Sequence, residues 1–143
     1  MIDIIKFSLL LVSFLLGSIP FGYLIGKLRG IDIREYGSKN IGATNIGRVL
    51  GFKYAFLAFL LDLLKGTLLV FLFRFAIITS EYMFLSPMVY GLLAVLGHSF
   101  SPFMNFKGGK AVATAAGALL GFSPLIFAFG FVIFVFLVIM TKI

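Results

Sequence analysis

Long apolar runs alternate with short polar connections along the chain, and the runs define the elements that we expect. Residues 7–26 and 82–106 carry no Lys, Arg, Asp or Glu, and residues 54–73 carry only Asp62 and Lys65. The hydrocarbon core of a bilayer, about 30 Å thick, is crossed by roughly 20 apolar helical residues. Each of these three runs therefore predicts one membrane-spanning helix.

The last apolar run, residues 111–141, has a length that suits neither one crossing nor two. As a single helix it would be about 46 Å long. The stretch "GFSP", residues 121–124, places a helix-breaking proline near the middle of the run. We therefore predict a shorter helix, a turn and a second helix that runs back.

These elements together predict an all-α fold, a polytopic integral membrane helix bundle that forms a single domain over residues 1–143. It has about five transmembrane or partly spanning helices. Their expected bounds are 5–26, 54–73, 82–102, 110–122 and 124–141, and the expected cytoplasmic loops are 27–53 and 103–110.

The composition supports a membrane protein. Hydrophobic residues make up 62% of the chain and charged residues only 12%, which leaves too little polar surface to cover a soluble globule. Cysteine is absent, which excludes disulfides, thiolate metal sites and thioester intermediates. We predict no metal and no cofactor. We also predict no nucleic-acid partner, although the net charge is +7, because the distribution of the positive charges along the chain is more informative than their sum.

Cations concentrate in the connection 27–53, whereas the connection 74–81 has one cation and one anion. The positive-inside rule places the first connection in the cytoplasm, together with 103–110. The N-terminus is then outside and the C-terminus inside. A cleaved signal peptide is the alternative for the first span, but the segment after it would be exported, and here that segment carries the strongest positive cluster.

The stretch "GSKNIGATNIGR", residues 37–48, combines recurring glycines with short polar side chains and two cations. Glycines let backbone N–H groups converge into concavities that bind anions. Ser38, Asn40, Thr44 and Asn45 add short hydrogen-bond donors, and Lys39 and Arg48 add positive charge. Thr44 or Asn45 is also expected to cap the helix entering the second span. Ala43 replaces the lysine of a Walker A loop, so nucleotide hydrolysis is disfavoured. A flexible connection with helix-capping residues is the alternative.

The stretch "FKGGKAVAT", residues 106–114, predicts a second anion site. Lys107 and Lys110 bracket Gly108 and Gly109 just before a helix, which places ammonium groups and backbone donors at a helix amino end. The alternative is that these lysines only mark the cytoplasmic side of a span.

Three ionisable residues stand apart from the loops. His98, the single histidine, is a candidate general base, and a histidine that only bonds loop carbonyls is the alternative. Acyltransferases that use acyl-CoA or acyl carrier protein commonly carry an H-x-x-x-x-D motif. Here Phe103 stands five residues after His98, so this class of acyltransferase is disfavoured. Asp62 and Lys65 share one helix face, and the cost of burying charge in hydrocarbon predicts mutual pairing; we favour a structural clamp over catalysis.

Three segments of the chain carry a further signal through their order and spacing: "GSIPFGYLIGKLRGIDIREYGSKNIGATNIGRVLG", "LDLLKG" and "GHSFSPFMNFKGGKAVAT". Together they closely resemble the bacterial acyl-phosphate:glycerol-3-phosphate acyltransferase family, PlsY. The resemblance includes two of the three cytoplasmic motifs of that family. Ala111 stands where the family usually has glycine. The chain stops at "MTKI", before the serine-bearing third motif, so we expect it to lack the C-terminal part and to be poorly active alone.

The resemblance implies transfer of an acyl chain from acyl phosphate to the 1-hydroxyl of glycerol 3-phosphate, which gives lysophosphatidic acid and phosphate without an acyl-enzyme intermediate. By the match of motif positions, one phosphate would be held by Ser38, Asn40, Thr44, Asn45 and Arg48, and the other by Lys107, Gly108, Gly109 and Lys110. The acyl tail would lie between helices among membrane lipids. The implied location is the bacterial cell inner membrane, with a functional link to an acyl-phosphate synthase. Two other functions stay open: a small anion transporter, whose pathway the Asp62–Lys65 pair would line, and a noncatalytic truncated membrane fragment.

Overall fold

The computed structural model describes residues 2–75, 77–78, 80–83 and 85–141, and this part of the chain contains helices and loops but no strand. The α-helices are α1 (Ile2–Ser18), α2 (Phe21–Leu28), α3 (Ala43–Leu50), α4 (Phe52–Arg74), α5 (Pro87–Ser99), α6 (Val112–Phe122) and α7 (Pro124–Thr141). Short 3-10 helices cover Ile33–Glu35, Ser80–Tyr82 and Pro102–Met104.

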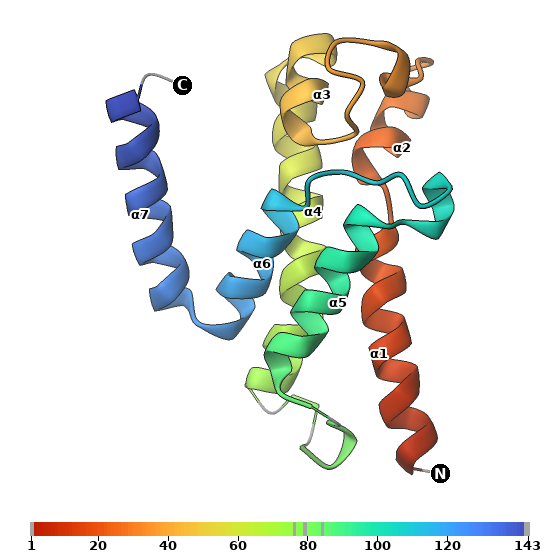
Figure 1. Ribbon diagram of the computed structural model, residues 1–143, viewed down its shortest axis with the longest axis vertical. Helices are drawn as coiled ribbons and strands as arrows, with labels where there is room; N and C mark the ends of the chain where they lie inside the picture. The colour runs from red at the N-terminus through yellow and green to blue at the C-terminus, as the bar shows by residue number, and fades with distance from the viewer. Residues whose placement is uncertain (1, 76, 79, 84, 142–143) are drawn as a thin grey trace.

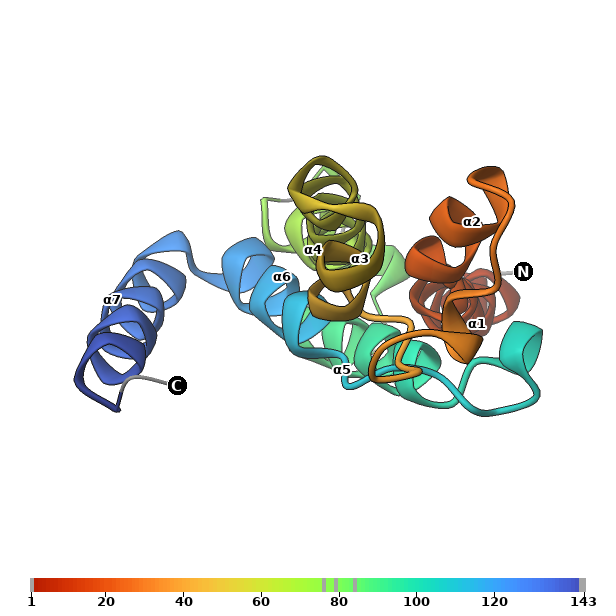
Figure 2. The ribbon, with the colours of Figure 1, turned by 90° about the horizontal axis from the view of Figure 1, so that it is seen from above.

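Helices α1, α4, α5 and α6 form the packed part of the molecule, and α7 stands at one side (Figure 1). The view from above shows α7 joined to the rest through α6 (Figure 2). The first described residues lie at the end opposite α2 and α3, whereas the last turn of α7 points toward the end that carries them. The two polar connections before α4 and before α6 also lie toward that end, so residues far apart in sequence meet there.

Glycines allow α4 and α6 to pack with their backbones in close contact. A methyl group added at Gly66 would collide with the carbonyl oxygen of Thr114, and one added at Gly117 would collide with that of Leu63. Small residues at helix interfaces are typical of membrane proteins, where close van der Waals packing drives association. This contact positions the start of α6 against the middle of α4.

The first predicted span, 5–26, is not one helix. It divides into α1 and α2, which are bent by 43°. Pro20 lacks an N–H group and its ring prevents a continuous helix. The carbonyl groups freed at the break have partners from other parts of the chain: the hydroxyl of Ser101, in the connection after α5, donates to Ser18 O at 2.6 Å, and Nζ of Lys65 in α4 donates to Ile19 O at 2.8 Å.

The third predicted span, 82–102, is too long. Helix α5 has 13 residues and starts at Pro87, which occupies the first turn. Its length is about 20 Å, shorter than the hydrocarbon core. The residue before a proline is biased away from helical geometry, and prolines at 87 and 102 therefore confine the helix. The predicted break at "GFSP" is confirmed, because α6 ends at Phe122 and α7 begins at Pro124.

The predicted loop 27–53 contains more helix than expected. Helix α2 continues to Leu28, the 3-10 helix Ile33–Glu35 follows, and α3 occupies Ala43–Leu50 before α4 begins. Gly51 joins α3 to α4 with φ of 91°, a left-handed conformation that favours glycine. The glycine-rich segment, residues 37–48, is therefore partly an ordered helix that lies on the start of α4.

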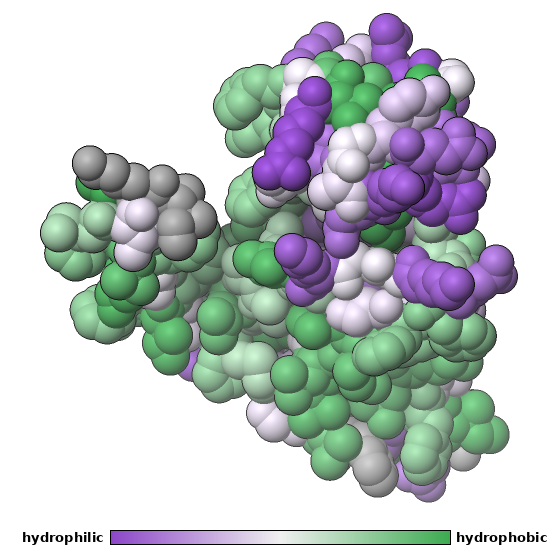
Figure 3. Space-filling model, turned by 45° about the horizontal axis from the view of Figure 1, so that its top comes forward, coloured by the Kyte–Doolittle hydropathy of each residue, from purple (hydrophilic) through white to green (hydrophobic). Residues whose placement is uncertain are grey.

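Helices α4 and α7 are each long and apolar enough to cross a membrane, and the bent pair α1–α2 would be a third span. No described residue of α7 is buried, which fits a helix that is apolar on all sides and faces lipid. Hydrophilic residues gather over the end of the molecule that carries α2 and α3, and apolar residues cover the helices below (Figure 3).

Candidate functional site

A cavity of about 390 Å³ lies where α3, α4, the end of α5 and the start of α6 meet. It brings together side chains from both predicted loops. The predicted site residues that line it are Ser38, Asn40, Thr44, Asn45, Arg48, His98 and Lys110. The structure thus joins two segments that are separated by the whole of α4 and α5.

Helix α3 contributes three of these residues, Thr44, Asn45 and Arg48. Thr44 and Arg48 are four residues apart and therefore lie on one helix face. Gly42 occupies the N-cap position of α3. The expectation that Thr44 or Asn45 caps the helix of the second span is wrong: Gly51 is the N-cap of α4. Thr44 and Asn45 lie instead in the first turn of α3, because the chain becomes helical at Ala43.

Asn45 organises the glycine-rich segment from within. Its Oδ1 accepts from the backbone N–H of Ser38 at 2.8 Å, and its Nδ2 donates to the carbonyls of Asn40 at 2.8 Å and Tyr36 at 3.1 Å. The side chain of Asn40 accepts from the N–H of Gly42 at 2.8 Å. Because both polar groups of Asn45 are engaged with backbone, this residue shapes the cavity wall.

The GGK loop, residues 107–110, docks on the end of α5. The N–H groups of Gly108 and Gly109 donate to the carbonyls of Ser99 at 3.0 Å and His98 at 3.1 Å. These two donors are therefore not free for an anion, contrary to the expectation from sequence. Lys107, Gly108 and Gly109 are outside the cavity lining, whereas Lys110 is part of it.

Ala111 follows Lys110 in the left-handed conformation, with φ of 55°, and forms the N-cap position of α6. Glycine adopts this conformation at a lower free-energy cost than alanine. Alanine at this position therefore holds a backbone conformation that glycine would adopt more readily.

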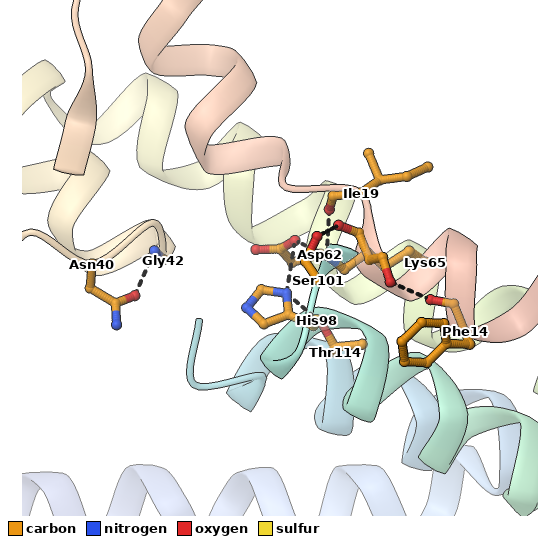
Figure 4. A network of polar contacts seen from close by, with 10 residues as sticks. Phe14, Ile19, Asn40, Gly42, Asp62, Lys65, His98, Ser101 and Thr114 are labelled. Carbon is orange, nitrogen blue, oxygen red and sulfur yellow. Dashed lines mark hydrogen bonds and ion pairs between the residues drawn. The ribbon is translucent and has the colours of Figure 1, made fainter. Parts of the chain in front are cut away.

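A buried polar network extends inward from the cavity (Figure 4). Nζ of Lys65 lies 2.8 Å from Oδ1 of Asp62, and the two side chains are 3% and 4% exposed. The predicted pairing is therefore confirmed. Nδ1 of His98 lies 3.6 Å from the same oxygen and 3.4 Å from the hydroxyl of Thr114. Asp62 also lines the cavity, a position that the sequence signalled only as an ionisable residue within an apolar run.

Two cations of the expected loops, Lys27 and Arg34, share one anionic partner. Arg34 pairs with Asp32 at 2.6 Å and holds the pKa of that carboxyl well below its usual range, and Lys27 lies 3.4 Å from the same carboxylate. In the described part of the chain, Arg48 and Lys110 form no ion pair. These two exposed cations are the ones available to an anion in the cavity.

The cavity has a further, apolar side. Phe59 of α4 and Phe134 of α7 contribute to its lining. Arg48, Lys110 and these two aromatic side chains line one cavity, so the arrangement can bind a small anion through the two cations, beside a wall suited to hydrocarbon.

Over the ranges that the structure describes, no group of three or more His, Cys, Asp or Glu side chains could hold a metal ion.

Comparisons with known proteins agree on one family. The family profile described as "Glycerol-3-phosphate acyltransferase" matches residues 7–143. The glycerol-3-phosphate acyltransferase of Lactococcus lactis subsp. lactis (strain IL1403) is 52% identical over 128 residues, which cover 89% of this chain and 58% of that protein. The enzyme of the same description from Acholeplasma laidlawii is 45% identical and covers 93% of this chain. The chain spans 58% and 60% of the length of these two relatives.

A crystal structure of PlsY (YgiH), an integral membrane glycerol 3-phosphate acyltransferase, matches this fold. Its glycerol 3-phosphate form gives a TM-score of 0.81 at 42% identity, covering 94% of this chain and 66% of that one. Its lysophosphatidic acid form gives a TM-score of 0.78 at 41% identity, covering 93% and 64%. The likeness indicates an all-helical membrane fold. On the profile match and these identities, the chain belongs to the glycerol-3-phosphate acyltransferase family.

Proposed function

We propose that this protein takes part in acyl transfer from acyl phosphate to the 1-hydroxyl of glycerol 3-phosphate, which forms lysophosphatidic acid and inorganic phosphate for phospholipid synthesis. The observation that carries the proposal is the cavity in which Arg48 of α3 and Lys110 of the GGK loop converge without ion-pair partners among the described residues. Two substrates that each carry phosphate match this cationic wall.

Arg48 and Lys110 bind phosphate oxygens in this proposal. Arg48 supplies a planar fork of donors, and Lys110 supplies a point charge with three donors. Ser38, Asn40 and Thr44 line the same cavity and add neutral donors. Asn45 and the glycines of the GGK loop hold the cavity wall in shape, and Lys107 adds positive charge outside the lining.

The reaction mainly requires the protein to align its two substrates. The acyl group of a mixed anhydride is already activated, so the hydroxyl of the acceptor attacks the carbonyl carbon and phosphate leaves. Holding both substrates in line can lower a barrier by roughly 7 to 11 kcal/mol. Cations near the leaving phosphate stabilise the charge that develops there. We assign no covalent intermediate to the protein.

His98 supports this site without acting as the general base. Its ring is 5% exposed and lies under Gly109, with Nδ1 directed to Asp62 and Thr114. A ring enclosed in this way is well placed to hold the GGK loop. Removal of the hydroxyl proton is then assisted by a phosphate oxygen of a substrate.

The acyl chain lies along the apolar side of the cavity, where Phe59 and Phe134 face it from α4 and α7. In this proposal the reaction takes place at the boundary between lipid and cytoplasm in the bacterial cell inner membrane, with the glycine-rich segment and the GGK loop inside the cell. The acyl phosphate comes from a membrane-associated acyl-phosphate synthase.

A binding and turnover series tests the proposal. Purified protein in detergent would be titrated with glycerol 3-phosphate and then given acyl phosphate, with lysophosphatidic acid followed by mass spectrometry. Arg48→Ala and Lys110→Ala should each weaken glycerol 3-phosphate binding about tenfold or more, since each loses a charge-assisted hydrogen bond. Arg48→Lys should recover only part of the affinity.

Lys53→Ala is the matched control, because Lys53 is an exposed cation of the same region that does not line the cavity. Equal losses for Lys53→Ala and Arg48→Ala would remove Arg48 from the site. Flux of phosphate into protein-containing vesicles in the absence of acyl phosphate would instead favour the anion transporter.

A further inference from the structure

One carboxylate occupies a cavity whose other charged groups favour anions. Asp62 is 3% exposed and lines the same cavity as Arg48 and Lys110. A carboxylate there repels a phosphate group, so Asp62 does not belong to the phosphate-binding wall. Its presence in the lining needs a different explanation from that of the two cations.

The neighbours of Asp62 hold its carboxyl group in place. Nζ of Lys65 lies 2.8 Å from Oδ1, and the same ammonium donates to Ile19 O at 2.8 Å, at the break between α1 and α2. Nδ1 of His98 lies 3.6 Å from Oδ1 on the other side.

The orientation of the carboxylate leaves room for a ligand. One oxygen is turned toward Lys65 and His98, and the other is turned toward the side on which Asn40 and Gly42 lie (Figure 4). Asn40 and Gly42 are themselves part of the cavity lining. An ionised carboxylate only accepts hydrogen bonds, so its natural ligand in the cavity is a donor such as a hydroxyl group.

We propose that Asp62 binds the hydroxyl groups of a phosphorylated polyol, whose phosphate lies at Arg48 and Lys110. This inference rests on the proposed function and deepens it, because it assigns the orientation in which the acceptor substrate is bound. The cations at the mouth attract the phosphate, and the carboxylate repels it and accepts hydrogen bonds from the hydroxyls. The two opposite charges thus orient the substrate with its hydroxyl end inward.

A purely structural Asp62 makes a different prediction from a ligand-binding Asp62. The ion pair with Lys65 would stabilise the bundle whether or not a hydroxyl ever entered the cavity. Only direct binding makes Asp62 responsible for the preference between ligands that differ in their hydroxyl groups. The test therefore compares ligands and uses variants that keep the buried charge balanced.

The ligands are glycerol 3-phosphate, n-propyl phosphate, which has the same chain length without hydroxyls, and inorganic phosphate. Dissociation constants would be measured by calorimetry on the purified chain. The wild type should prefer glycerol 3-phosphate to n-propyl phosphate by about tenfold or more, as expected for hydrogen bonds to a charged acceptor.

The main variant is Asp62→Leu/Lys65→Met, which removes both charges. It should bind the two organic phosphates within about twofold of each other and bind inorganic phosphate at least as tightly as the wild type does. Asp62→Asn/Lys65→Met, which retains a neutral acceptor, should show an intermediate preference. Thr114→Val is the matched control: it alters the network at His98 outside the cavity lining and should leave the preference unchanged.

A variant that binds inorganic phosphate and still prefers glycerol 3-phosphate as the wild type does would overturn the inference and leave the proposed function intact. Equal loss of all three ligands in both double variants would show that the pair is only structural. A wild-type protein that binds none of the three would overturn the proposed function and, with it, the role of Asp62.

Discussion

Gly109 lies directly against the imidazole ring of His98, and a methyl group added at this glycine would collide with Nε2 of the ring. The backbone completes the contact, because the N–H of Gly109 donates to the carbonyl of His98 at 3.1 Å. The end of α5 and the GGK loop are therefore one packed unit. Lys110, the next residue, is directed to the cavity by this contact.

Gly109→Ala should displace the GGK loop and with it Lys110. We expect glycerol 3-phosphate affinity to fall about tenfold, as for loss of a charge-assisted contact. His98→Ala/Gly109→Ala should recover part of that affinity, since the smaller side chain makes room for the methyl group. The measurement is a dissociation constant for each variant. Gly130→Ala is the control, because nothing lies within 4 Å of its added methyl group. Equal effects at 109 and 130 would contradict the packing argument.

Gly117→Ala should destabilise the bundle itself. The added methyl group would collide with the carbonyl of Leu63, and overpacking of this kind costs about 1 to 3 kcal/mol. Thermal unfolding in detergent, followed by circular dichroism, should show a midpoint well below that of the wild type. Gly130→Ala again serves as the control and should leave the midpoint nearly unchanged. A Gly117→Ala protein as stable as that control would mean that α4 and α6 are not in close contact.

Lys65→Met should be more damaging than removal of the whole ion pair. The single variant leaves the Asp62 carboxylate buried without its ammonium partner, which costs about 3 to 5 kcal/mol. Asp62→Leu/Lys65→Met removes both charges and should recover most of that loss, although Ile19 O still lacks its donor. Unfolding midpoints of the two proteins give the comparison. A double variant no more stable than the single one would reject an electrostatic origin.

The proposed orientation in the membrane predicts which positions a reagent reaches from each side. A cysteine at Ser38 or Lys107 should react only from the cytoplasmic side, whereas one at Glu81 should react in intact cells with a membrane-impermeant maleimide. All three positions are exposed in the structure, so access depends on the side of the bilayer alone. Labelling of Ser38 and Glu81 from the same side would reject this topology.

Local sequence signals were sufficient for several elements. An apolar run long enough to cross a bilayer predicted the helix now seen as α4, and the proline in "GFSP" predicted the break between α6 and α7. Pairing of Asp62 with Lys65 followed from their spacing and from the cost of an unpaired charge in hydrocarbon. Such properties depend on neighbouring residues along one helix, which the order of amino acids alone describes.

The tertiary structure decided what depends on contacts between distant segments. Arg48 and Lys110 line one cavity because α4 and α6 pack closely enough to bring their loops together. The donors of Gly108 and Gly109 are used by α5, and Asp62 lies at the cavity, facts that no local pattern contains. A hydrogen-bond donor or a charge acquires its role from what lies within a few ångströms of it, and for these residues the neighbours that form the cavity come from other helices and loops.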